Sequence, residues 1–156
     1  MKPTITRPRL VRATYWDWGD ILHIDEVCFP DDVRVEREDA SAWWLAYVGD
    51  KAVGHAGVKL YWMPGSRRAF LCRAAVLPEF RGRSIHHDLI KKRLAYAESL
   101  QCHFAFTYTV ANNHASGNNL CDMGFRMYEP ENPWTGVDYT VYWRKWLEEG
   151  KRLLAA

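Results

Sequence analysis

Hydrophobic positions along the chain follow two spacings, which predict strands and helices in an interspersed order. Spacing typical of strands, with apolar residues in unbroken runs or at alternate positions, occurs at 9–14, 43–48, 52–62, 70–77, 102–110, 125–128 and 137–143. Helical spacing occurs at 18–28, 85–100, 113–123 and 144–154, and a further short helix is expected at 33–40. This order predicts a mixed sheet flanked by helices, in an α+β, α/β-like arrangement.

The length of the chain limits the organisation that these elements can adopt. With 156 residues, one domain spanning 1–156 is expected. No uninterrupted apolar run reaches the ~18–20 residues that a membrane helix needs, and the first nine residues lack the apolar stretch of a signal peptide. We therefore expect a cytoplasmic protein with no membrane partner.

Charge and cysteine content exclude several further classes. The 21 basic and 19 acidic residues nearly balance, which argues against a nucleic-acid partner in spite of the dense basic stretch at 81–93. The spacing of the four cysteines fits neither C-x-x-C nor a zinc pattern. Adjacent helical residues such as His86 and His87 point about 100° apart, so no metal site is expected.

Aromatic residues are unusually frequent, at 14 % with eight tryptophans. They fill either the core or a binding cleft. Trp43 and Trp44 are neighbours in a predicted strand, so their side chains point to opposite faces, and at least one is expected to line a cleft or an interface. The last predicted helix, with Leu147, Leu153 and Leu154, packs either on its own sheet or on a second copy in a homodimer.

The segment at 75–85 carries the clearest chemical signal. A buried strand ends at Pro78, a short basic loop containing Gly82 follows, and a helix begins directly after the loop. Unpaired N–H groups and the dipole at the start of a helix attract anions, and Arg81 and Arg83 add charge-assisted donors. The pattern fits a phosphate or pyrophosphate site, and equally an ordinary strand-to-helix turn with solvated arginines.

Two motifs resemble those of the GNAT superfamily of acyl-CoA-dependent N-acetyltransferases. The first motif, Val-x-Pro-x-Tyr/Phe-Arg-Gly-x-Gly-Ile-Gly, runs from the fourth strand into the main helix. It is matched here by Val76, Pro78, Phe80, Arg81, Gly82 and Ile85. The second motif is matched by Asn113, Ser116, Gly124 and Phe125. The first helix also has a loose similarity to the N-terminal protein acetyltransferase branch.

This resemblance implies a fold and a cosubstrate. The fold would be a mixed, mostly antiparallel sheet of six to seven strands, splayed between the fourth and fifth strands, where acetyl-CoA lies. Ala75 and Val76 would pair their backbone with the pantetheine arm, which Asn113 would also contact. The backbone N–H groups that would hold the pyrophosphate belong to Gly82, Arg83, Ser84, Ile85, His86 and His87. Ser84 and His86 stand where the family usually has glycine or alanine.

Proton transfer needs further groups, because the attacking amine must be neutral and the departing thiolate benefits from an acid. In the N-terminal branch the usual base is a glutamate, at the position of Tyr108, and the usual acid is a tyrosine, at the position of Leu120. The catalytic candidates are Tyr108, which could order a water or protonate sulfur, and His55, because imidazole titrates near neutral pH. The alternative for both is a structural side chain with a satisfied polar atom.

These observations support an enzyme that moves an acetyl group from acetyl-CoA to a primary amine by direct transfer in a ternary complex. The amine acceptor is either a small molecule or a protein. The alternative is a GNAT-like module that binds CoA or a protein partner without turnover, favoured by the missing glutamate and tyrosine and by the bulk of His86.

Overall fold

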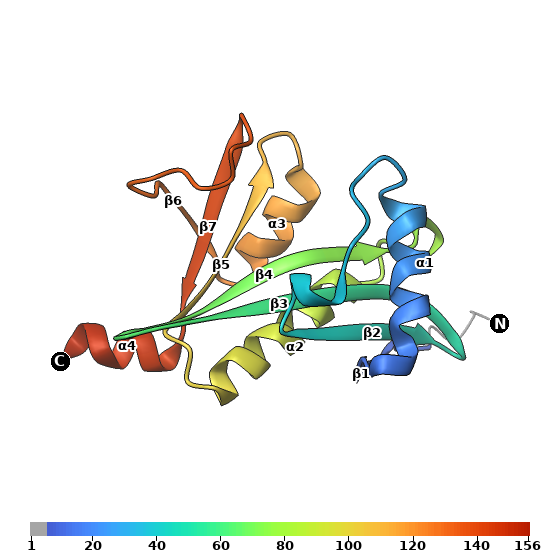
Figure 1. The fold of residues 1–156 in the computed structure, drawn as a ribbon, viewed down its shortest axis with the longest axis horizontal. Coiled ribbons are helices and arrows are strands. Elements are labelled where there is room, and N and C mark those ends of the chain that lie inside the picture. Colours follow the sequence, from blue (N-terminus) through green and yellow to red (C-terminus); the bar gives the residue numbers. More distant parts are fainter. Residues whose placement is uncertain (1–5) are drawn as a thin grey trace. The chain divides into compact units, whose positions relative to one another are not determined.

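The computed structural model describes residues 6–156, and its elements follow the predicted interspersed order except at the helix expected at 33–40 (Figure 1). The strands are β1 (Arg9–Arg12), β2 (Ala42–Val48), β3 (Lys51–Met63), β4 (Ser66–Val76), β5 (Phe104–Val110), β6 (Arg126–Tyr128) and β7 (Thr140–Trp146). The α-helices are α1 (Trp18–Cys28), α2 (Ile85–Ser99), α3 (His114–Asp122) and α4 (Glu148–Ala155). Short 3-10 turns are η1 (Tyr15–Asp17), η2 (Arg37–Asp39) and η3 (Pro78–Phe80).

The strands form one seven-stranded sheet in the order β1-β2-β3-β4-β5-β7-β6. The pair β1–β2 is antiparallel, as are β2–β3, β5–β7 and β6–β7, whereas β4 and β5 run parallel over Arg68–Phe70 and Phe104–Phe106. The predicted fold class is confirmed: the sheet is mixed, mostly antiparallel, open and splayed, with flanking helices.

The chain divides into two compact units, and the long strands β3 and β4 contribute to both. Unit 1 comprises the chain up to Lys59 together with Cys72–Lys92. Unit 2 comprises Leu60–Leu71 and Arg93–Ala156.

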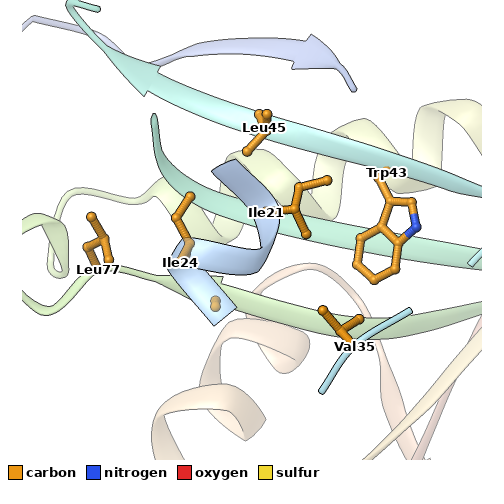
Figure 2. Close-up of a cluster of buried hydrophobic side chains, with 7 residues drawn as sticks. Ile21, Ile24, Val35, Trp43, Leu45 and Leu77 are labelled. Carbon is orange, nitrogen blue, oxygen red and sulfur yellow. The ribbon is translucent and has the colours of Figure 1, made fainter. Parts of the chain in front are cut away.

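The core of unit 1 forms where α1 packs on strands of the sheet (Figure 2). Ile21 and Ile24 are three residues apart and lie on the same face of α1, fully buried. Trp43 and Leu45, two residues apart in β2, share the opposing face of the strand. The remaining members of this cluster are Val35, Ala75 and Leu77.

The expectation that Trp43 or Trp44 would line a cleft or an interface is wrong. Trp43 and Trp44 are 7 % and 5 % exposed, so both faces of β2 are covered. Trp43 packs edge-on against Trp18 at a centroid distance of 5.4 Å, and the guanidinium of Arg12 lies 5.1 Å from the Trp44 ring. These two tryptophans therefore belong to the protein interior.

Unit 2 has its own core, on the face of β5 and β7 that α3 covers. Trp143 is buried and donates a hydrogen bond from Nε1 to the Thr109 hydroxyl at 2.9 Å. Gly117 of α3 approaches this indole so closely that an added Cβ would lie 3.2 Å from it. Leu147, at the start of α4, is also buried, whereas Leu153 and Leu154 are exposed.

The helix predicted at 33–40 is wrong, and so is the predicted position of the last strand. Residues 33–40 form only the turn η2, in which Glu36 donates its backbone N–H to Asp39, and Arg37 is held over the Tyr15 ring at 4.0 Å. The last strand lies about three residues later than expected, at Thr140–Trp146, because the loop before it is tied by hydrogen bonds among Thr135, Thr140 and Tyr142.

No helix in the described part of the chain is long and apolar enough to cross a membrane. Residues 6–156 contain no group of three or more His, Cys, Asp or Glu side chains placed to hold a metal ion. The four cysteines are free thiols: Cys102 is buried, Cys28 and Cys72 are half-buried, and Cys121 is exposed.

Candidate functional site

The loop between β4 and α2 lies in unit 1 and presents consecutive backbone donors. Gly82 and Ser84 both have positive φ, at 75° and 61°. Among the described residues no acceptor takes the backbone N–H of Gly82, Arg83 or Ser84. The carbonyl of Ser84 accepts the N–H of Asp88 at 3.1 Å, so the loop runs directly into the first turn of α2. This is the geometry of an anion site: free N–H groups together with the positive end of a helix.

The end of β4, which precedes this loop, is buried and hydrogen-bonded to β3. Ala75 and Val76 are buried, and the N–H of Leu77 donates to Val53 of β3 at 2.8 Å. Since alternate backbone groups of a strand point to opposite edges, the backbone of Val76 points away from β3. Its carbonyl accepts from Nε of Arg81 at 2.9 Å and from the thiol of Cys28 at 3.4 Å.

The basic side chains of the loop differ in what they contact. Arg81 folds back on the end of β4, where its Nε donates to the carbonyl of Val76 at 2.9 Å. Arg83 is exposed, with its guanidinium 5.0 Å from the Phe80 ring. His86 and His87, in the first turn of α2, are half-buried.

His55 lies in a buried polar network in unit 1. It is 0 % exposed, and its Nε2 is 3.0 Å from Oδ1 of Asp25. Arg73 of β4 donates to both oxygens of the same carboxylate, each at 2.8 Å, and to Asp32 at 3.0 Å. The Arg73 guanidinium also lies 4.2 Å from the Phe29 ring. Arg73 therefore ties the segment that follows α1 to β4.

This network fixes the charge of Asp25. Burial by itself would raise the pKa of Asp25, but hydrogen bonds and positive charge from Arg73 and His55 outweigh it and lower the pKa from 3.8 to about 2. The hydrogen bond to Asp25 in turn raises the pKa of Arg73. Asp25 is therefore an anion throughout the neutral range.

The other two predicted site residues lie in unit 2. Tyr108 of β5 is 38 % exposed, stacked on Phe70 at a centroid distance of 6.3 Å and in edge contact with Trp134 at 5.5 Å. Asn113 is the N-cap of α3, and its Oδ1 accepts the N–H of Ser116 at 3.2 Å. The second motif thus has a clear local function, which is to begin α3.

Unit 2 also contains a cavity of about 650 Å³ lined largely by aromatic side chains. Its wall comes from Tyr61 of β3, Phe70 of β4, Phe104 and Phe106 of β5, Tyr128 of β6, and Trp134 of the β6–β7 loop. Trp134 stands edge-on to both Phe70 and Phe106 at 5.6 Å. Two arginines, Arg68 and Arg144, line the same cavity, as do Glu129 and Glu131.

Comparison with known proteins places the chain in a family. Its sequence matches the model of the acetyltransferase (GNAT) family over residues 8–125. The chain belongs to the GNAT acetyltransferase family. A search of curated proteins with the sequence finds no match.

Solved GNAT structures share the fold at low sequence identity. One is Arabidopsis thaliana Naa50 in complex with the bisubstrate analogue CoA-Ac-MVNAL: identity is 20 %, the match covers 90 % of this chain and 99 % of that chain, and the TM-score is 0.74. A second is Arabidopsis thaliana NAA60 in complex with a bisubstrate analogue: identity is 15 %, the match covers 92 % of this chain and 99 % of that chain, and the TM-score is 0.72. A third is the ribosomal-protein-S18-alanine N-acetyltransferase from Escherichia coli: identity is 13 %, the match covers 88 % of this chain and 92 % of that chain, and the TM-score is 0.69. These neighbours confirm, at the level of the fold, the likeness to the N-terminal acetyltransferase branch.

The structure brings together the predicted residues of the first motif in unit 1, whereas Tyr108 and Asn113 lie in unit 2. Sequence reasoning missed the network of Asp25 and Arg73 and the cavity arginines Arg68 and Arg144. The one available signal was Arg73, the single charge inside an otherwise apolar predicted strand.

Proposed function

We propose that this GNAT protein transfers the acetyl group of acetyl-CoA to a primary amine by direct attack in a ternary complex. The observation that carries the proposal is the loop at Gly82–Ser84, with its unaccepted N–H groups at the start of α2. Such donors suit a pyrophosphate, whose charge also interacts favourably with the helix dipole. The N–H groups of Ile85, His86 and His87 continue this site, and the exposed Arg83 adds a charged donor.

The pantetheine arm is proposed to lie along Ala75 and Val76. Val76 supports this best, because its backbone points away from β3 while its carbonyl is fixed by Arg81 and Cys28. Arg81 would then act on the cofactor indirectly, by holding the end of β4 rather than by touching phosphate. The amide group of Asn113 would contact the same arm.

In the proposed reaction the neutral amine nitrogen attacks the thioester carbonyl carbon, and the carbon–sulfur bond breaks. The nitrogen loses a proton to water, and the sulfur leaves as the thiol of CoA. We propose that Tyr108 donates the proton to sulfur and regains one from the water that has taken the amine proton; its ring lies at the surface of unit 2 with 38 % exposure. The full burial of His55 and its hydrogen bond to Asp25 support a positioning role for His55 instead.

The test combines binding and turnover. Calorimetry with acetyl-CoA should show one site, and release of CoA thiol should follow when primary amines are added. Tyr108→Phe should lower kcat and leave acetyl-CoA affinity unchanged, because the hydroxyl serves only the chemical step. Absence of acetyl-CoA binding by the unmodified protein would falsify the proposal. Binding without turnover over a broad amine panel would favour the non-catalytic module.

Asn113 allows a sharper test of the cofactor site. Asn113→Asp keeps an oxygen that accepts the N–H of Ser116 and so keeps the cap of α3, but it removes the amide donor. Asn113→Ala removes both. If Asn113 contacts pantetheine, both variants bind acetyl-CoA more weakly, and only Asn113→Ala also loses about 1 kcal/mol of stability.

One structural relative indicates the kind of molecule that supplies the acceptor amine. Naa50 was captured with the analogue CoA-Ac-MVNAL, which joins CoA to a short peptide sequence. We propose that the acceptor amine here, on a small molecule or a protein, is received by unit 2 near Tyr108.

A further inference from the structure

The aromatic cavity of unit 2 lies on one face of its sheet. Along β5, Phe104, Phe106 and Tyr108 alternate with residues of the opposite face. The sheet register sets Arg68 opposite Phe104 on one side of β5, and Arg144 opposite Phe106 on the other side. The two arginines therefore flank the same row of rings.

Neither arginine has a carboxylate partner among the described residues. Arg68 donates from one terminal nitrogen to the thioether of Met63 at 2.6 Å, and its buried Nε meets no acceptor in residues 6–156. A thioether sulfur is a weak acceptor, so this guanidinium is poorly satisfied. Arg144 stacks instead on rings, 4.5 Å from Tyr128 and 5.0 Å from Trp146.

The acidic residues of the cavity do not neutralise these charges. Glu129 and Glu131 are exposed, and neither is within ion-pair distance of Arg68 or Arg144 in the described chain. Exposed charges are strongly screened, whereas the arginines are half-buried against low-dielectric rings. The inner part of the cavity therefore favours an anion.

We propose that this cavity selects an acceptor amine that also carries a carboxylate and a flat apolar group, such as an aromatic amino acid. Rings of the acceptor would pack on Phe104 and Phe106 within a volume of about 650 Å³, which lies in the range of small-molecule sites. The carboxylate would accept from Arg68 and Arg144, because guanidinium groups match its planar geometry. The proposal rests on the proposed function for the fate of the amine, but the binding preference does not require turnover.

The test measures binding of matched pairs that cannot react. N-acetylphenylalanine carries the carboxylate, and N-acetylphenylalaninamide lacks it. A third probe, acetyl-aspartyl-phenylalaninamide, carries its carboxylate on a side chain. We expect the first probe to bind at least tenfold more tightly than the amide. If the third probe binds best, the carboxylate comes from a peptide side chain rather than from a free amino acid.

Variants then assign the preference to the arginines. Arg68→Met and Arg144→Met should each reduce the carboxylate preference to about twofold or less, while Arg68→Lys and Arg144→Lys retain part of it. Arg152→Gln, which changes an arginine on α4 outside the cavity, should leave the preference unchanged. Equal affinity for acid and amide, or an unaltered preference in both methionine variants with native circular dichroism, overturns the proposal. If the unmodified protein shows the carboxylate preference but does not release CoA from acetyl-CoA when amines are added, that result counts against the proposed function and not against the binding preference.

Discussion

Ser84 adopts a left-handed backbone conformation, with φ of 61°, in the loop that begins α2. A side chain at such a position costs roughly 1–2 kcal/mol, whereas glycine avoids the clash. The conformation explains why glycine is usual here in the family and why serine is tolerated: serine keeps the N–H that the loop presents. The loop thus keeps its free N–H groups at a cost in stability.

Replacing Ser84 by glycine should therefore raise the free energy of unfolding. We expect Ser84→Gly to stabilise the protein by about 0.5–1 kcal/mol, since relief of the left-handed strain exceeds the extra entropy of an unfolded glycine. Ser84→Ala keeps the Cβ and should give no gain. Gly82→Ala makes the reverse test, because φ is 75° there and an added Cβ meets no atom within 4 Å. Denaturant unfolding of the three variants measures these differences, and a destabilised Ser84→Gly would contradict the strain.

Asp25 should make the stability of the protein sensitive to acid. Its pKa is about 2 in the folded chain, against 3.8 without its partners. A group whose pKa is lower in the folded state stabilises the fold at any pH above its unfolded-state pKa. This contribution is lost as the pH falls from about 4 to 2. The amount is on the order of 2 kcal/mol.

The matched variant is Asp25→Asn. At pH 6 it should be less stable than the parent by about 3–5 kcal/mol, because Arg73 loses a buried ionic partner. The difference should shrink as pH approaches 2, when the parent carboxylate also becomes neutral. Denaturant melts at several pH values provide the measurement. A difference that does not change with pH would show that Asp25 is not held as an anion.

At the scale of elements, periodicity was sufficient where a stretch of chain packs on one layer. The helices at 18–28 and 85–99 begin within a residue of the predicted positions, since apolar stripes and Pro30 or Gly82 mark their ends. Periodicity failed at 33–40. There Val35 is buried in the core of unit 1, and the side chain of Arg37 packs on the Tyr15 ring instead of facing along a helix. Periodicity also failed at β7, whose start depends on hydroxyl contacts of the preceding loop.

The candidate site was predictable only where its residues are close in sequence. The loop at 75–87 is one segment, so its motif and its structure coincide. Asp25 is 30 residues from His55 and 48 from Arg73, and no local pattern links them. The same holds for Arg68 and Arg144, which the sheet register brings to the same cavity.

The packing of α4 depends on one small residue. An added Cβ at Gly150 would fall into the carbonyl group of His103 and within 2.9 Å of the Trp146 ring. Gly150→Ala should destabilise the protein by about 1–3 kcal/mol, because the contact is with backbone that cannot rotate away. Gly19→Ala, on α1 with no atom within 4 Å, should be neutral or up to about 1 kcal/mol more stable. Thermal melts compare the two; an unaffected Gly150→Ala would show that α4 packs more loosely.

At the scale of the whole molecule, binding of acetyl-CoA should raise the free energy of unfolding. A ligand at a hundredfold excess over its Kd that binds only the folded state adds about 2.7 kcal/mol, or roughly 5–10 °C in Tm for a chain of this length. We expect this shift with acetyl-CoA, and a much smaller one with pantetheine at the same concentration, because pantetheine lacks the pyrophosphate that the loop would bind and so has a higher Kd. Thermal unfolding with each ligand measures it. Equal shifts would mean that the loop at Gly82–Ser84 contributes little to binding.

In unit 2 the strands of the sheet form the floor of the aromatic cavity, and the loop that carries Trp134 covers part of it. The strands β4 and β5 supply the floor of the cavity through Phe70 and Phe106, whereas Trp134 belongs to a loop that packs on these two rings. Changes in this loop can thus alter which molecules fit without rebuilding the sheet. If the cavity receives the acceptor as proposed, natural variation or directed evolution can change the choice of acceptor by exchanging this loop, while the strands maintain the fold.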